Sequence, residues 1–220
     1  MPTISKENYI KTVYQLDSES DQSVTTSQIA QTLDITNAAT SEMAKKLAEN
    51  GLLNYEKYKG VELTDNGKQM ALNIIRRHRL WELFLIEVLG LTWGEVHDEA
   101  ELLEHTTSDF LIDKIDRFLN YPKFDPHGYP IPDKNGILPE FSSGIPLKDT
   151  EPGKFYKVLR VDDKQAGMIE YISRLGISLM CEIRLIEKLS FDNSVMIEIN
   201  GNSHLISEKV SEKIFVEIII

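Results

Sequence analysis

Histidines and carboxylates are concentrated in one short stretch near the middle of the chain. Seven potential metal ligands occur among the eleven residues 95–105. Residues three and four apart on a helix lie on one face. A helix would therefore align four of these side chains in one stripe: His97, Glu101, Glu104 and His105. His78 and Glu82, a little upstream, repeat the four-residue spacing. Oxygen and imidazole ligands without a thiolate favour Mn²⁺ or Fe²⁺, although zinc or nickel would also bind.

Such a run of charges is most often a solvated face of a helix, and that simpler interpretation has to be weighed first. Two features argue against it: both histidines share the side of the carboxylates, and Leu102 and Leu103 are expected on the opposite, core-facing side. A catalytic metal site would need an open coordination position and a positioned base. The sequence contains no HExxH or similar signature, so we expect a binding site rather than an enzyme.

The formal net charge of −11 is unevenly distributed along the chain. Residues 1–80 carry ten basic and ten acidic side chains, whereas residues 81–220 carry 14 basic and 25 acidic ones. A neutral N-terminal part still grips phosphates where lysines are locally placed. The longest apolar run, residues 83–93, is too short to span a bilayer. We therefore expect no membrane partner. A single cysteine, Cys181, excludes an intramolecular disulfide and is typical of a protein of the reducing cytoplasm.

Helix signals dominate the first part of the chain. A helix is expected over residues 5–16, and helices over 26–33 and 38–50 flank a tight turn, which is the helix-turn-helix pattern. Two short strands, 52–57 and 61–63, follow directly. They predict the β-hairpin of a winged helix.

The start of the second helix in such a pair faces the major groove of DNA. Here these residues are Thr36, Asn37, Ala38, Ala39, Ser41 and Glu42. The expected contacts to the DNA backbone are the lysines Lys45, Lys46, Lys57 and Lys59. The Glu42 carboxylate would either accept a hydrogen bond from cytosine or repel phosphate. The alternative is a helical hairpin used for protein contacts, but a wing in the correct place favours DNA.

The remainder of the chain divides into helices, a linker and strands. Three further helices are expected over 65–89, 92–105 and 108–119, followed by a proline-rich ordered linker at 121–152. From residue 154 onward, four short strands around one helix suit a small barrel. The expected strands are 155–161, 181–188, 195–199 and 214–219, and the helix is 165–175. The predicted fold class is therefore mainly α with a small β domain.

Three segments resemble the diphtheria toxin repressor family of metal-dependent regulators in its three-domain form. Residues 77–82 and 96–105 resemble the two-part metal motif of that family, and residues 128–132, Gly-Tyr-Pro-Ile-Pro, resemble the motif after its dimerisation helices. The resemblance covers nearly the whole chain. It implies three domains: a winged helix-turn-helix at 1–70, a helical metal-binding and dimerisation domain at 71–140, and a linker with an SH3-like barrel at 141–220.

The same resemblance implies two metal sites. The first corresponds to Glu101, Glu104, His105 and Asn8. The second corresponds to His78, Glu82 and His97, or to a variant with ligands at Asp125, His127 and Asp162.

At one position this sequence matches one branch of the family, and at two others it differs from the residues usual in the family. Glu101 stands where iron-type members have cysteine and manganese-type members have glutamate, and a hard ligand favours Mn²⁺. Asn8 replaces an aspartate or methionine and would be a weaker, neutral ligand. Lys11 stands where some manganese regulators have a bridging glutamate, which argues against their two-metal cluster.

These observations together predict a homodimeric transcriptional repressor, activated by Mn²⁺ or by Fe²⁺, that binds a palindromic operator and controls metal homeostasis genes. In the metal-free protein, repulsion between Glu101 and Glu104 is expected to leave the first helix mobile. A cation would neutralise both carboxylates and tie Asn8 to them. The alternative is a winged-helix regulator with an organic effector and a purely structural metal site.

Overall fold

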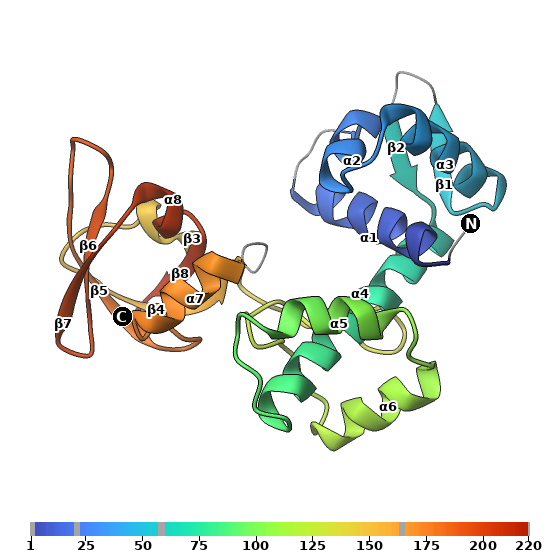
Figure 1. Ribbon diagram of the computed structural model, residues 1–220. Helices are drawn as coiled ribbons and strands as arrows, with labels where there is room; N and C mark the ends of the chain where they lie inside the picture. The colour runs from blue at the N-terminus through green and yellow to red at the C-terminus, as the bar shows by residue number, and fades with distance from the viewer. Residues whose placement is uncertain (1–2, 20–22, 57–59, 163–165, 220) are drawn as a thin grey trace. The chain divides into compact units, whose positions relative to one another are not determined.

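The computed structural model describes residues 3–19, 23–56, 60–162 and 166–219 (Figure 1). Its contacts divide the chain into two compact units. The first unit comprises Met1–His78, Glu101–Lys114 and Pro132–Leu138. The second comprises Arg79–Ala100, Ile115–Ile131 and Pro139–Ile220. No helix within the described ranges is long and apolar enough to cross a membrane.

The N-terminal elements form the predicted winged helix, shown in blue to cyan in Figure 1. They are α1 (Thr3–Glu19), α2 (Thr26–Thr32), α3 (Asn37–Glu49), β1 (Leu53–Glu56) and β2 (Gly60–Leu63). The two strands pair antiparallel, with Leu53 opposite Leu63. One apolar core joins the helices to this hairpin and includes Ile10, Ile29 and Leu47. Burying these side chains fixes the three helices and the hairpin as one body.

Local signals in the sequence explain where α2 and α3 begin. Thr25 and Gln28 form a capping box, in which each side chain accepts a hydrogen bond from the backbone N–H of the other residue. The hydroxyl of Thr36 caps α3 by accepting from the N–H of Ala39 at 3.2 Å. After α3 the chain turns at Gly51, whose φ of 70° suits a residue without a side chain.

Three helices follow the hairpin: α4 (Asp65–Glu87), α5 (Val96–Glu104) and α6 (Asp109–Phe118). Each has residues in both units. Within the first unit, Arg76 pairs with Asp113 at 2.9 Å and Arg77 with Asp109 at 2.7 Å, which fastens α4 to α6. The expectation that Leu102 lies in the core is wrong, because its side chain is 68% exposed. The inward face of α5 is instead supplied by smaller residues such as Val96 and Ala100.

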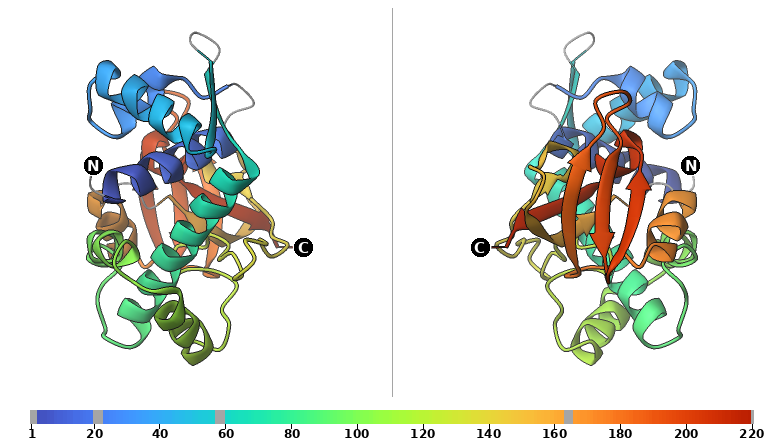
Figure 2. Two further views of the ribbon diagram at one scale, coloured as in Figure 1. Left: turned by 90° about the vertical axis from the view of Figure 1, so that its right-hand side faces the viewer. Right: turned by 90° about the vertical axis from the view of Figure 1, so that its left-hand side faces the viewer.

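The C-terminal part is an antiparallel sheet with short helices, in orange to red in Figure 2. Its strands are β3 (Ile145–Pro146), β4 (Phe155–Val161), β5 (Glu182–Lys188), β6 (Val195–Ile199), β7 (Asn202–Ile206) and β8 (Ile214–Ile218). Their order in the sheet is β3-β8-β4-β5-β6-β7. The helices here are α7 (Ala166–Arg174), α8 (Glu208–Ser211) and the single 3₁₀ turn η1 (Leu147–Asp149).

The predicted small β domain is confirmed, and the buried residues of its core all lie between Leu147 and Val216, with Trp93 packed against them. Cys181 packs against that core as expected, and burial raises the pKa of its thiol. Strand β7 is absent from the prediction because its residues are mostly polar and exposed. It is held by a tight turn at Asn200 and Gly201, both with positive φ, which folds it back on β6.

Candidate metal centre

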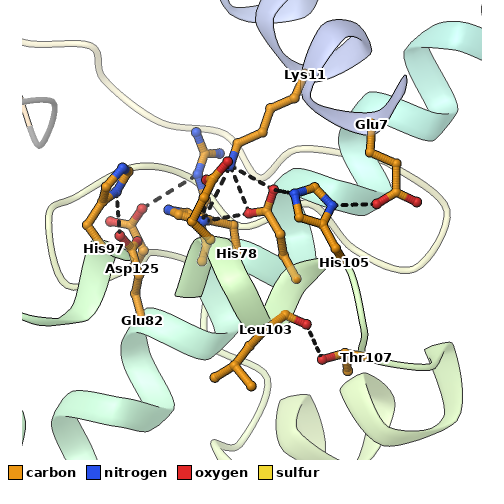
Figure 3. Close-up of polar contacts among 12 residues, drawn as sticks. Glu7, Lys11, His78, Glu82, His97, Leu103, His105, Thr107 and Asp125 are labelled. Carbon is orange, nitrogen blue, oxygen red and sulfur yellow. Dashed lines mark hydrogen bonds and ion pairs between the residues drawn. The ribbon is translucent and has the colours of Figure 1, made fainter. Parts of the chain in front are cut away.

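The first cluster of acidic and imidazole side chains lies within the first unit, where α1 meets α4 and α5. The ammonium of Lys11 on α1 lies 2.7 Å from Glu101 Oε2. It also lies 3.0 and 2.8 Å from the two carboxylate oxygens of Glu104. Figure 3 shows Lys11 extending from α1 into these contacts. The repulsion expected between the two glutamates is therefore compensated by a cation that the chain itself supplies.

Two histidines complete this first cluster. His78 on α4 places Nδ1 2.6 Å from Glu104 Oε2 and 3.4 Å from the Lys11 nitrogen. His105, just after α5, places Nδ1 2.5 Å from Glu7 Oε2 and Nε2 3.5 Å from Glu104 Oε1. The Glu104 side chain is completely buried. It is the group on which the contacts of this cluster converge.

Two buried polar atoms of the first cluster lack a hydrogen bond among the described residues. They are Oδ1 of Asn8 and Nε2 of His105. A buried polar atom without a partner costs free energy, so such an atom in a native fold calls for an explanation. Both residues are predicted ligands, and a cation would give each atom the partner that the protein does not.

The second cluster lies within the second unit and is built around Glu82 of α4. The fully buried carboxylate has Oε1 3.5 Å from His97 Nδ1 and 3.9 Å from His127 Nε2. His127 is also fully buried, with its ring centroid 5.3 Å from that of Trp93. Neither ring nitrogen of His127 has a hydrogen-bond partner in the parts of the chain described. An imidazole in this state is poorly satisfied and is a ready ligand.

A tight turn holds His127 in place. Oδ1 of Asp125 accepts hydrogen bonds from the N–H groups of His127 and Tyr129, both at 2.9 Å, and Oδ2 lies 3.5 Å from Arg79 Nε. The turn requires Gly128, which has φ of 92°. A Cβ at this glycine would lie 2.1 Å from the carbonyl oxygen of Leu159, so no other residue fits without displacing the backbone.

Asp162 follows the last residue of β4. Val161 donates its N–H to the carbonyl of His127 at 2.9 Å, which brings the end of β4 to the turn. The buried Asp162 side chain lies 3.3 Å from the Lys213 ammonium. The turn and the end of β4 thus bring three predicted ligands of the variant second site into one neighbourhood of the second unit: Asp125, His127 and Asp162.

Within each of the two units, several predicted ligands gather into one cluster. Glu101, Glu104 and His105 gather with Asn8 on the adjoining turn of α1, and His78 joins them through Glu104. Glu82 gathers with His97 and His127. The sequence analysis missed Glu7 as a member of the first cluster, and it named Lys11 only as the residue where some manganese regulators have a bridging glutamate. Their spacing of four residues on a helix around Asn8 was the signal that could have found them.

The residues predicted to contact DNA lie at the exposed start of α3. Thr36, Asn37, Ala38, Glu42, Lys45 and Lys46 are exposed, and Ala39 and Ser41 are half-buried. The opposite face of α3 packs into the core through Met43, Ala44 and Leu47. Lys46 donates to Glu42 at 2.7 Å, and this hydrogen bond with its charge lowers the pKa of the Glu42 carboxyl. Lys57 and Lys59 lie outside the described residues.

Both clusters offer carboxylate oxygens and imidazole nitrogens and no thiolate. Such a donor set suits a hard or borderline divalent cation such as Mn²⁺ or Fe²⁺. Buried atoms of Asn8, His105 and His127 that have no hydrogen bond among the described residues are consistent with such an ion. Glu101, Glu104 and Glu82 each have a basic or imidazole partner.

Three family descriptions match the chain in succession. Residues 1–61 match the iron dependent repressor, N-terminal DNA binding domain. Residues 64–133 match the iron dependent repressor, metal binding and dimerisation domain, and residues 145–218 match the FeoA domain. The winged helix, both clusters' helices and the C-terminal sheet thus each fall within a known family.

Individual proteins and structures give the same result. The iron-dependent repressor IdeR of Mycobacterium tuberculosis is 35% identical over 136 residues, which are 61% of this chain and 59% of that protein. The chain thus spans less than two thirds of that relative's length. The HTH-type transcriptional regulator MntR of Oceanobacillus iheyensis is 39% identical over 125 residues, which are 57% of this chain and 84% of that protein. A manganese-dependent transcriptional repressor, solved in complex with manganese, has 34% identity and a TM-score of 0.89, covering 97% of this chain and 100% of that one.

Proposed function

Because this chain belongs to the iron-dependent repressor family, we propose that it is a metal-activated transcriptional repressor of the cytoplasm. Its activating ion is Mn²⁺, with Fe²⁺ as the alternative, and its target is a palindromic operator that controls metal homeostasis genes. The relatives support the class of regulator, since they include iron-dependent and manganese-dependent repressors. The choice of Mn²⁺ is supported by Glu101, a hard ligand where a thiolate would favour softer ions.

The observation that carries this proposal is that α1 belongs both to the core of the winged helix and to the first cluster of acidic and imidazole side chains. The apolar face of α1, including Ile10 and Val13, forms part of the winged-helix core. The same helix sends Glu7 and Lys11 into the acidic cluster of α5. A change in the charge of that cluster therefore acts directly on an element of the DNA-binding domain.

The first site would be held by Asn8, Glu101, Glu104 and His105. A bound divalent cation would supply the positive charge that these oxygens and imidazoles need. Glu101 and Glu104 stay on α5, and Asn8 contributes its buried Oδ1 from α1. In this way the side chains of both helices fix the position of α1 and, through the shared core, that of α3.

The second site would be held by Glu82 and His127, with His97, Asp125 and Asp162 as the remaining candidates. It is supported by the buried His127 ring, which has no hydrogen bond to any described residue, and by the buried Glu82 carboxylate beside it. The division of labour expected from the sequence belongs to the same proposal: DNA binding by residues 1–70, metal binding and dimerisation by 71–140, and an SH3-like domain at 141–220.

The DNA contacts are assigned to α3. The residues at the major groove include Thr36, Asn37, Ser41 and Glu42, and the DNA backbone is contacted by Lys45 and Lys46. Dimerisation is supported by exposed apolar side chains on α5 and α6, Leu102, Phe110 and Leu111. A twofold dimer places two recognition helices about one DNA turn, roughly 34 Å, apart. That spacing is the reason to expect a palindrome.

The test is recovery of genomic DNA fragments by the purified protein in three conditions: with Mn²⁺, with Fe²⁺ in the absence of oxygen, and with a chelator. We expect a few palindromic promoter fragments to be enriched only when metal is present. Equal enrichment with chelator would leave a DNA-binding protein without a metal switch, as in a winged-helix regulator with an organic effector. No enrichment in any condition would overturn the proposed function.

A further inference from the structure

We propose that Lys11 is a built-in competitor for the first metal site: its ammonium holds Glu101 and Glu104 in the metal-free protein and has to leave before a divalent cation binds. Lys11 thereby sets the metal concentration at which the protein responds. This inference rests on the proposed metal activation and concerns how that activation is tuned.

The geometry of the ammonium carries this inference. Lys11 Nζ is within 3.0 Å of three carboxylate oxygens, one from Glu101 and two from Glu104. His78 Nδ1 is 3.4 Å away. An ammonium has only three N–H groups to donate, and the side chains within reach of this one, Glu101, Glu104 and His78, are all predicted metal ligands. The side chain is 8% exposed, so these are buried contacts and not a loose surface pair.

The two cations cannot share this position. Hard divalent ions bind oxygen at about 2.0–2.6 Å, whereas the Lys11 nitrogen already lies 2.7 to 3.0 Å from the same oxygens. An ion placed among the carboxylates would lie well inside contact distance of a like-charged ammonium. Binding is therefore an exchange, in which Lys11 moves away as the ion enters.

Asn8 is the residue through which α1 would be connected to α5 once the ion has displaced Lys11. It lies three residues before Lys11 on the same face of α1, and its buried Oδ1 has no hydrogen-bond partner among the described residues. In the metal-free protein α1 is attached to α5 through Lys11. With an ion in place it is attached through Asn8, one helical turn earlier. The attachment of the winged helix thus differs between the two states even though α1 contacts α5 in both.

The first experiment measures metal affinity without DNA. Free Mn²⁺ is followed by its electron paramagnetic resonance signal while the full-length chain is titrated, for the unaltered protein, Lys11→Gln and Lys154→Gln. Lys154 is the matched control, since it is a lysine in an exposed ion pair with Glu151. We expect Lys11→Gln to bind Mn²⁺ at least about tenfold more tightly at one site, because the competing charge is gone. Lys154→Gln should bind like the unaltered protein.

The result that overturns the inference is an equal or weaker affinity of a folded Lys11→Gln protein for Mn²⁺. Failure of both the unaltered protein and Lys11→Gln to bind Mn²⁺ would overturn the proposed function as well. The two failures are thereby distinguished, because the first leaves metal binding intact and removes only the role of Lys11.

The second experiment uses the unaltered chain and does not depend on the folding of any variant. Lysines are acetylated briefly with and without saturating Mn²⁺, and the modification of each lysine is measured by peptide mass spectrometry. Lys11 should be protected without metal and become several-fold more reactive with it, while Lys154 does not change. Equal or lower reactivity of Lys11 with Mn²⁺ would show that the ammonium stays in place, and the inference would be wrong.

Discussion

The two clusters of acidic and imidazole side chains differ in how their charges are balanced. In the first, Lys11 reaches the centre and contacts both Glu101 and Glu104. In the second, the nearby cations pair at the edge, with Arg79 beside Asp125 and Lys213 beside Asp162. The buried His127 ring keeps both nitrogens without hydrogen bonds among the residues described. The same ligand types thus give one cluster whose two glutamates are already neutralised by a lysine of the chain, and one whose buried histidine ring has no hydrogen bond among the described residues.

The types of ligand in a cluster therefore do not by themselves determine how much a bound ion adds to the stability of the fold. Carboxylates that a lysine already neutralises stabilise the metal-free protein and resist metal. An unsatisfied cluster costs stability until a partner arrives. Substitutions in the two clusters should therefore have opposite consequences for the metal-free and the metal-loaded protein.

The largest effect is expected from Glu104→Gln in the first cluster. The change removes the buried charge that faces Lys11 and leaves only Glu101 to compensate it. Breaking a buried ion pair costs about 3–5 kcal/mol, and we expect about 3 kcal/mol because one partner remains. Urea unfolding in the presence of a chelator measures this loss. Glu151→Gln, which removes an exposed carboxylate paired with Lys154, is the control and should leave the midpoint unchanged.

The second largest effect is expected from His127→Leu, and it should appear only with metal. Replacing an unsatisfied buried ring by an apolar side chain should change metal-free stability by less than about 1 kcal/mol. With Mn²⁺ at about a hundred times its dissociation constant, one lost site removes about 2.7 kcal/mol of stabilisation. Thermal unfolding with and without Mn²⁺ separates the two terms. A large loss in the metal-free state would mean that the second cluster is as well satisfied as the first.

Gly128→Ala tests whether the second cluster depends on its turn. The new Cβ would lie 2.1 Å from the Leu159 carbonyl oxygen, at a φ of 92°. Strained backbone of this kind costs about 1–3 kcal/mol, and we expect about 2 kcal/mol together with the loss of one Mn²⁺ per chain. Gly153→Ala is the matched control, since Gly153 has a φ of 83° but nothing within 4 Å of its Cβ position. Equal costs and equal metal counts in the two variants would show that the clash has no role.

The smallest effect is expected from Glu42→Gln on α3. This change removes one partner of the exposed ion pair between Glu42 and Lys46. Lys46 lowers the pKa of Glu42, so the carboxylate remains ionised as the pH falls through the usual glutamate range. Replacing it frees Lys46 for phosphate, and the dependence of DNA affinity on salt should steepen by about one charge at pH 6 and at pH 8 alike. Filter binding to non-operator DNA at several salt concentrations measures the slope. An unchanged or shallower slope would instead indicate that Lys46 does not face the DNA backbone.

The sequence by itself determined the elements and the class of protein. Capping residues such as Thr36 and the return at Gly51 mark α3 locally, and the spacing of His97, Glu101, Glu104 and His105 aligns ligands on a helix before any fold is known. Strand β7 and the exposure of Leu102 escaped prediction. The first is a polar edge strand, which depends on its neighbour, and the second depends on which face of α5 meets the rest of the protein.

Only the tertiary structure decided how the ligands are shared out and balanced. His78 is four residues from Glu82 in the sequence, yet its Nδ1 contacts Glu104 and Lys11. Lys11 lies 90 residues or more from Glu101 and Glu104. Its four-residue spacing from Glu7 places it on the same face of α1 but does not show that its ammonium contacts these two glutamates. Periodicity fixes which side chains share a face of one helix. Which faces meet is set by burial of apolar surface across the whole fold, and that is why the partner of each charge emerged only in three dimensions.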